Sequence, residues 1–161
     1  MRRFNILILC TGNSARTILA EALLRRLGYA RFTAYSAGSH AAGEVHPNTV
    51  ELLSAERYNP KSFCSKSWDE FAQTDAPKMD IVITVCDAVA GESCPLWPGQ
   101  PVRVHWGLPD PAKVEEPAAR RAAFRDTYAA LERRVRALQS LSDAQLGDAK
   151  ALAQVHAEAD R

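Results

Sequence analysis

The feature that most constrains this 161-residue chain is an apolar strand that leads directly into a short loop and then a helix. Apart from Asn5, residues 4–9 are apolar, which predicts a strand covered on both faces of a parallel sheet. The loop runs from Cys10 to Arg16, and residues 15–27 carry apolar side chains at helical spacing before Gly28. A strand–loop–helix unit predicts an α/β fold with the loop at the carboxyl edge of the sheet.

The loop residues have the groups needed to bind an oxyanion and to attack it. A loop of this length can turn its backbone N–H groups toward a tetrahedral anion, aided by the positive end of the following helix. The same field favours a thiolate at Cys10, which would make this residue a nucleophile near neutral pH. Arg16 supplies a planar guanidinium that can hold two oxygens of the anion. We therefore predict a reaction site in this loop.

Strand and helix patterns alternate along the rest of the chain. Further strands are expected at 31–36, 81–85 and 102–105, and helices from Pro47, over 115–141, and from a capping box formed by Ser142 and Gln145. This alternation predicts an α/β sheet with helices on both faces. We expect residues 1–141 to form a catalytic domain and residues 142–161 to form a C-terminal helical extension.

Composition narrows the class of partner. The chain has 20 Lys and Arg against 19 Asp and Glu, and this balance gives no reason to expect nucleic acid or an acidic membrane as a partner. The apolar run at 4–9 is too short for a signal peptide or a membrane span, so a cytoplasmic location is expected. A monomer is the default expectation. In the cytoplasm the four cysteines would be reduced at rest, and any disulfide would be catalytic or transient. No metal site is expected, because no Cys-x-x-Cys pair occurs.

Together, the Cys-x5-Arg loop and the late Asp110-Pro111 resemble the low-molecular-weight tyrosine phosphatases. The resemblance implies a three-layer α/β sandwich with a central parallel four-stranded sheet. It also implies that Cys10 is the nucleophile, that Arg16 binds the anion's oxygens and that Asp110 protonates the leaving group. The oxyanion-binding residues would be those of the loop and its first helical position, namely Thr11, Gly12, Asn13, Ser14, Ala15, Arg16 and Thr17.

Three further features resemble a narrower branch, the arsenate reductases built on the same fold. They are the start of the loop at residues 10–14, the pair Cys86 and Cys94 followed by Pro95, and the stretch 105–107 that leads to Asp110. Two departures stand out. Some thioredoxin-linked members separate the two cysteines by six residues, whereas seven lie between them here, and Thr17 occupies a position that is often serine. The spacing bears on whether Cys94 is the resolving cysteine.

The resemblance implies an arsenate reductase of arsenic detoxification that works by a cysteine relay, with possible residual phosphatase activity. Cys10 would form a thiol–arsenate adduct, with Asp110 donating a proton to the departing oxygen. Cys86 would attack the Cys10 sulfur to release arsenite, and Cys94 would then attack Cys86 to leave a Cys86–Cys94 disulfide. No bound cofactor is implied. An external thiol system, either thioredoxin or glutathione with glutaredoxin, would reduce that disulfide.

Other interpretations remain open from the residues alone. The chain could be a phosphotyrosine phosphatase that uses Cys10, Arg16 and Asp110, or a protein that binds an oxyanion or senses redox state without turnover. Cys86 and Cys94 could be inert core thiols, and Asp110 a simple turn residue. Glu21 is interpreted as an acid on the surface of a helix, and Cys64 as incidental. His105 could line the pocket or be structural, and Trp97 and Trp106 could pack in the core or rim the mouth of the pocket.

Overall fold

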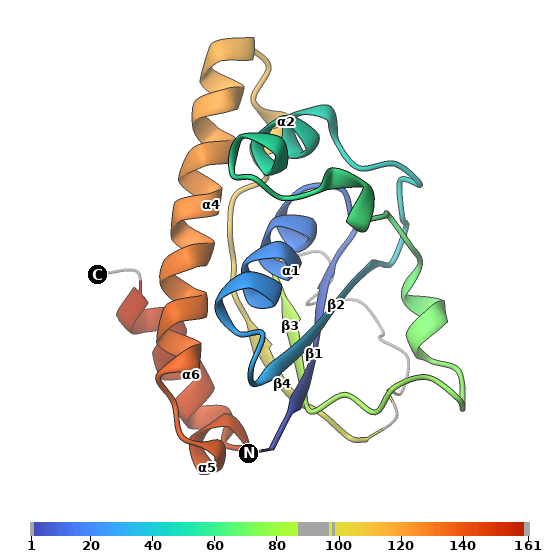
Figure 1. The fold of residues 1–161 in the computed structure, drawn as a ribbon, viewed down its shortest axis with the longest axis vertical. Helices are drawn as coiled ribbons and strands as arrows, with labels where there is room; N and C mark the ends of the chain where they lie inside the picture. Colours follow the sequence, from blue (N-terminus) through green and yellow to red (C-terminus); the bar gives the residue numbers. More distant parts are fainter. Residues whose placement is uncertain (1, 87–96, 98, 160–161) are drawn as a thin grey trace.

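The computed structural model describes residues 2–86, 97 and 99–159, and its centre is a parallel β-sheet (Figure 1). Its four strands lie in the order β2-β1-β3-β4 and are all parallel. Their bounds are Phe4–Cys10 for β1, Phe32–Gly38 for β2, Ile81–Thr84 for β3 and Val102–His105 for β4. Because all four run the same way, their carboxyl ends meet at one edge of the sheet, where ligands of open α/β sheets bind.

Strand β1 is the middle of the hydrophobic core. The side chains of Ile6, Leu7, Ile8 and Leu9 are completely buried, so both faces of this strand are covered, as the apolar sequence predicted. In the register of the sheet, Leu9 lies beside Thr84 of β3 on one side and Ala37 of β2 on the other. The end of β1 is therefore held between two neighbours before the loop begins.

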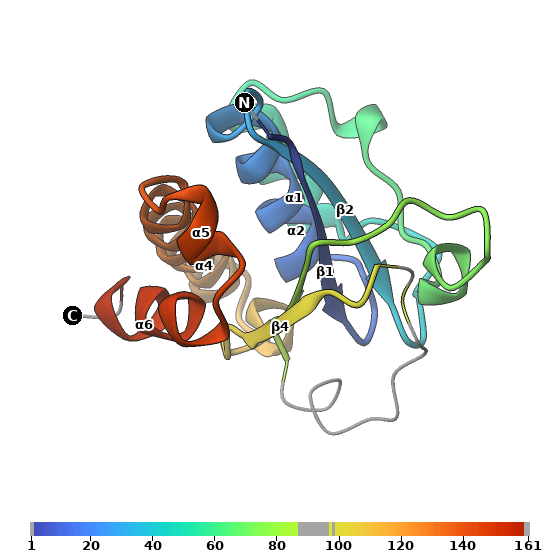
Figure 2. The ribbon, with the colours of Figure 1, turned by 90° about the horizontal axis from the view of Figure 1, so that it is seen from below.

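Helices flank the sheet. They are α1 Arg16–Leu27, α2 Pro47–Ala55, α4 Pro117–Gln139, α5 Asp143–Leu146 and α6 Ala149–Ala159. The described residues also form the 3-10 turns η1 Pro60–Ser62, η2 Trp68–Phe71 and η3 Pro111–Lys113. Helices α1 and α4 pack together, and η2 lies on the opposite side of β2 from α4 (Figure 2). The expected fold class, a four-stranded parallel sheet flanked by helices, is confirmed.

The C-terminal segment differs from the prediction of one continuous helix. The predicted capping box is present, with the Gln145 N–H donating to the Ser142 hydroxyl and the Ser142 N–H donating to the Gln145 side chain. The helix that it starts ends after one turn, however, because Gly147 closes it by donating to carbonyls within that turn. The Asp148 carboxylate then accepts from the Lys150 N–H and begins α6.

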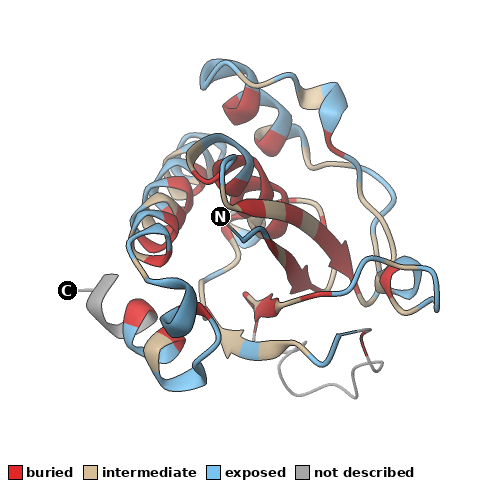
Figure 3. Cartoon of the chain, turned by 60° about the horizontal axis from the view of Figure 1, so that its bottom comes forward, coloured by how far each residue is buried: buried red, intermediate tan, exposed pale blue. Residues whose placement is uncertain are grey.

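Helix α6 lies against α4 and β4 and buries a stripe of apolar side chains there (Figure 3). Leu152 and Val155 are almost fully buried, and Leu146 of α5 is completely buried, whereas Ala149 is exposed. The segment after residue 141 thus contributes to the same core as the sheet. In the part of the chain that the structure describes, no helix is long and apolar enough to cross a membrane.

We expect Leu152→Ala to lower the free energy of unfolding by about 2–4 kcal/mol, because it empties a site packed against the main core. Gln154→Ala lies two residues further along α6 on its exposed face and should change the free energy of unfolding by less than about 0.5 kcal/mol. Urea unfolding followed by circular dichroism measures both. A small effect of Leu152→Ala would mean that α6 is an appendage that does not unfold with the sheet.

Candidate active site

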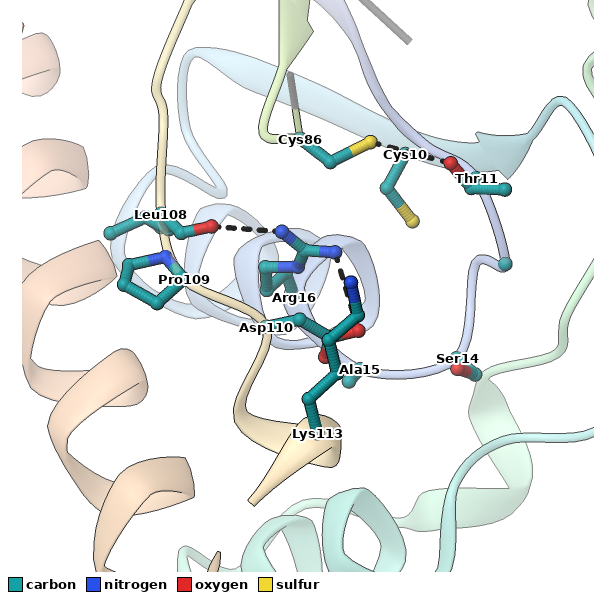
Figure 4. Close-up of a pocket in the computed structure, with 11 residues that line it drawn as sticks. Cys10, Thr11, Ser14, Ala15, Arg16, Cys86, Leu108, Pro109, Asp110 and Lys113 are labelled. Carbon is teal, nitrogen blue, oxygen red and sulfur yellow. Dashed lines mark hydrogen bonds and ion pairs between the residues drawn. The ribbon is translucent and has the colours of Figure 1, made fainter. Parts of the chain in front are cut away.

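A pocket of about 550 Å³ opens at the carboxyl edge of the sheet, around the loop between β1 and α1 (Figure 4). It brings together four residues from three distant parts of the sequence, namely Cys10 and Arg16 of the loop, Cys86 and Asp110. The other residues that line it are Thr11, Gly12, Ser14, Ala15, Leu108, Pro109 and Lys113. Among the predicted loop residues, Asn13 and Thr17 are fully buried behind the pocket and do not line it.

The Cys10 thiol is buried at the end of β1 and accepts directed hydrogen bonds. The Asn13 N–H donates to its sulfur at 3.0 Å, and the Thr17 hydroxyl lies 3.4 Å from it. Burial raises the pKa of Cys10 above the ordinary thiol value, while the contacts with Thr17, Asn13 and Arg16 oppose that rise. Burial therefore works against the thiolate that the loop is expected to favour, because the loss of water around the sulfur outweighs these contacts.

Asn13 holds the loop in shape through a buried network. Its backbone is left-handed, with φ of 49°, a conformation that Asn tolerates better than most residues. Its amide group donates to the Thr17 and Ser36 hydroxyls at 2.8 and 2.9 Å, and its amide oxygen accepts from the Lys66 N–H at 2.9 Å. One side chain thus joins the loop to α1, β2 and the segment before η2.

Glu21 continues this network below the loop. It accepts from the Ser36 hydroxyl and pairs with Arg25, and only 2% of it is exposed. Burial raises the pKa of the Glu21 carboxyl, while the hydrogen bond from Ser36 and the charges of Arg25 and Lys66 oppose that rise. The interpretation of Glu21 as a surface acid is therefore wrong. A signal existed in the sequence, because the neighbouring positions of α1 are apolar all round, which is typical of a buried helix.

Helix α1 begins at the pocket without a capping side chain. Its first residue follows Ala15, which has no side chain able to accept from the first turn, and no cap hydrogen bond is formed. The starts of α2, α4 and α5 are each capped by a side chain, those of His46, Glu116 and Ser142. The free N–H groups of α1 are therefore available to an anion in the pocket.

Arg16 and Asp110 face each other across the pocket. The Arg16 guanidinium donates to the Leu108 carbonyl at 2.8 Å, and its other terminal nitrogen lies 3.7 Å from the Asp110 carboxylate. The second Asp110 oxygen accepts from the Ala112 N–H at 3.0 Å and caps η3. Asp110 thus serves as a turn residue and also presents one oxygen to the pocket.

Cys86 enters the pocket because of strand register. Thr84 at the end of β3 lies beside Leu9, so the residues that follow β3 lie beside Cys10 at the same edge. The Cys86 sulfur is 3.5 Å from the Thr11 hydroxyl and points into the pocket (Figure 4). Cys94, the predicted resolving cysteine, and Pro95 lie outside the described residues.

Several other side chains lie away from the pocket or were not predicted. Trp106 is completely buried and Trp97 is 4% exposed, and neither lines the pocket, so they do not form its rim. His105 is hydrogen-bonded to the Thr84 hydroxyl at 2.7 Å and does not line it either. Cys64 is exposed. The sequence reasoning missed Lys113, although a turn that begins at Asp110 returns its third residue toward the same site.

Comparison with known proteins identifies the family of this chain. The family model described as low molecular weight phosphotyrosine protein phosphatase matches residues 5–152, which is most of the chain. The chain belongs to this family. The match includes the loop, Cys86, Asp110 and the start of α6, and it confirms the first resemblance drawn from the Cys-x5-Arg motif.

Individual relatives of this chain, which belongs to the phosphatase family, carry the name arsenate reductase. A protein named arsenate reductase from Halalkalibacterium halodurans is 36% identical over 115 residues, covering 71% of this chain and 79% of that protein. An arsenate reductase structure from Archaeoglobus fulgidus superposes with a TM-score of 0.64 at 27% identity, covering 84% of this chain and 99% of that one. A thioredoxin-dependent arsenate reductase from Corynebacterium glutamicum superposes with a TM-score of 0.62 at 28% identity. That match covers 85% of this chain, which spans 60% of the Corynebacterium protein.

We expect Thr17→Val to slow the alkylation of Cys10 by iodoacetamide at pH 7.5 about fivefold. The Thr17 hydroxyl lowers the Cys10 pKa, so its loss raises that pKa and leaves less thiolate at any pH below it. The pH at which alkylation is half-maximal should move upward. Thr127→Val, which removes a hydroxyl bonded to the Ala123 carbonyl in α4, is the matched control and should leave the rate unchanged. An unchanged rate in Thr17→Val would show that the hydroxyl does not stabilise the thiolate.

Proposed function

We propose that this protein reduces arsenate to arsenite through a Cys10 thiol–arsenate adduct and a relay of cysteines. The observation that carries the proposal is the presence of Cys86 in the same pocket as Cys10, beside the Thr11 hydroxyl. Hydrolysis of a phosphate ester needs one nucleophilic thiol, whereas a transfer of two electrons to arsenic needs a second. The names of the relatives support the same reaction.

In the first step, arsenate occupies the loop as phosphate would, with its oxygens on the N–H groups of the loop and on Arg16. The Cys10 thiolate forms a bond to arsenic, and the oxygen of one arsenate hydroxyl group leaves. Asp110 is held within reach of the pocket by η3 and gives that oxygen a proton, so that it departs as water.

In the second step, the Cys86 thiolate attacks the Cys10 sulfur. A Cys10–Cys86 disulfide forms, the sulfur–arsenic bond breaks, and its electron pair stays on arsenic, which leaves as arsenite. The Thr11 hydroxyl lies 3.5 Å from the Cys86 sulfur and helps to hold it in the pocket. Cys94 then attacks the Cys86 sulfur, which restores the Cys10 thiolate and leaves a Cys86–Cys94 disulfide.

An external dithiol must reduce that disulfide, and we propose thioredoxin for this step. A protein disulfide formed outside the catalytic loop is a substrate that thioredoxin can attack, and one structural relative is named for its thioredoxin dependence. Glutathione with glutaredoxin is the alternative donor. A reducing cytoplasm is the compartment in which such a cycle can run, and we place the protein there.

A single turnover without any donor tests the relay. We expect reduced protein mixed with excess arsenate to lose two thiols, to release one equivalent of arsenite, and to show a Cys86–Cys94 disulfide by mass spectrometry. Cys94→Ser should still release arsenite but stop at a Cys10–Cys86 disulfide. Cys86→Ser should release none. Cys64→Ser is the matched control, because this exposed cysteine lies outside the pocket, and it should behave as the unchanged protein.

Survival of all four thiols in that experiment would contradict the relay. Hydrolysis of p-nitrophenyl phosphate by the same protein would then favour a phosphatase that uses Cys10, Arg16 and Asp110. Anion binding with neither reaction would favour a binding or sensing protein. Addition of thioredoxin with its reductase and NADPH, compared with glutathione and glutaredoxin, separates the two donors by the rate of repeated turnover.

We expect Asp110→Asn to lower the rate of the first step about a hundredfold or more, because the amide cannot supply a proton to the departing oxygen. Rapid-quench measurement of thiol loss gives this rate. Phosphate binding should weaken little or even improve, since the change removes a negative charge near Arg16. A rate close to that of the unchanged protein would mean that Asp110 only caps η3.

A further inference from the structure

Lys113 lines the pocket in the described part of the chain, yet the relay proposed above gives it no role. It ends the η3 turn that Asp110 begins, and its side chain reaches toward Arg16 (Figure 4). We propose that Lys113 is a specificity-determining residue that binds the outward oxygens of the substrate and selects tetrahedral dianions over monoanions. This inference deepens the proposed function and rests on it for arsenate as the substrate.

The position of Lys113 is fixed by the same turn that fixes Asp110. The Lys113 N–H donates to the Asp110 carbonyl at 3.2 Å, and the Asp110 carboxylate accepts from the Ala112 N–H at 3.0 Å. Pro111 between them is buried and pre-sets the first position of the turn. The backbone of Lys113 is thus anchored at the pocket, and its flexible side chain can extend from there to an anion bound in the loop.

The charges on the pocket wall show what Lys113 adds. Arg16 and Lys113 are the positive side chains among the described lining residues, and Asp110 is the negative one. Arg16 already donates to the Leu108 carbonyl and lies 3.7 Å from the Asp110 carboxyl group, and a Cys10 thiolate would take up more of its positive field. Unlike Arg16, Lys113 forms no ion pair with any of the described residues. It is therefore free to meet the charge of an anion that the loop already holds.

The chemistry of the rim fits a free inorganic oxyanion better than an aryl ester. Leu108 and Pro109 are the larger apolar residues of the described lining, and none of the described lining residues is aromatic. An aryl group leaving from the outward side would find no ring to stack on there. A free oxyanion instead presents a charged oxygen outward, which an ammonium group can bind. Coulomb attraction scales with the charge of the anion, so the gain for a dianion is twice that for a monoanion.

Sulfate and perchlorate test this inference because both are tetrahedral and neither is reduced by thiols under these conditions. Each is titrated into the reduced full-length protein at fixed pH and ionic strength, and binding is read as protection of Cys10 from iodoacetamide by mass spectrometry. We expect Lys113→Gln to weaken perchlorate about threefold and sulfate about tenfold, since the dianion loses twice the attraction. Lys113→Arg should restore sulfate binding, because it restores the charge.

Lys150→Gln is the matched control, since it removes the same charge from an exposed position on α6. It should leave both affinities unchanged. Equal weakening of the two anions by Lys113→Gln, no weakening, or the same loss in Lys150→Gln would each overturn the inference. The test does not require turnover. If the anion affinities change as expected but the protein never reduces arsenate, the role of Lys113 stands and the proposed reductase function is wrong. If the protein reduces arsenate but Lys113→Gln leaves the anion affinities unchanged, the reductase function stands and the role of Lys113 is wrong.

Discussion

The candidate site depends first on the buried amide of Asn13. With a left-handed backbone, this residue turns its N–H inward to the Cys10 sulfur, and its side chain bonds to three different parts of the fold. An unpaired amide at this depth would be costly, so the loop keeps its shape only while all these partners are in place. The same shape allows β2 to approach closely. A Cβ at Gly38 would lie 2.4 Å from the Thr11 carbonyl oxygen, so only glycine fits there.

The parallel register of the sheet then determines which chemistry the loop can perform. A loop with one cysteine and one arginine supports phosphoryl transfer, and the fold of the whole family provides that much. The pairing of β1 with β3 adds a second thiol at the same edge. The two sulfurs belong to residues 76 positions apart, and sheet geometry rather than sequence proximity brings them together. A modest change in a strand end can thus alter the reaction class of an existing oxyanion pocket.

Local patterns predicted much of this structure because they act over short distances. The buried strand β1, the loop, the first helix and the Ser142 capping box follow from apolar spacing and from cap chemistry. The break at Gly147 was missed because an apolar stripe can continue across two helices that share one buried face. The raised pKa of Cys10 was missed for a different reason. The sequence shows the groups that favour a thiolate, but the loss of solvent around a sulfur depends on the packing of the whole edge.

The uncapped start of α1 affects the stability of the protein in solution. A capping side chain contributes about 1 kcal/mol to a helix, and here that contribution is left to whatever anion occupies the pocket. Folding and occupancy are therefore thermodynamically linked, and any tetrahedral anion that binds the native state makes the chain harder to unfold. Phosphate is a tetrahedral anion of this kind, and its effect on unfolding would measure this linkage. An ordinary metabolite would then preserve the protein against heat and proteolysis while it competes with the substrate for the same pocket.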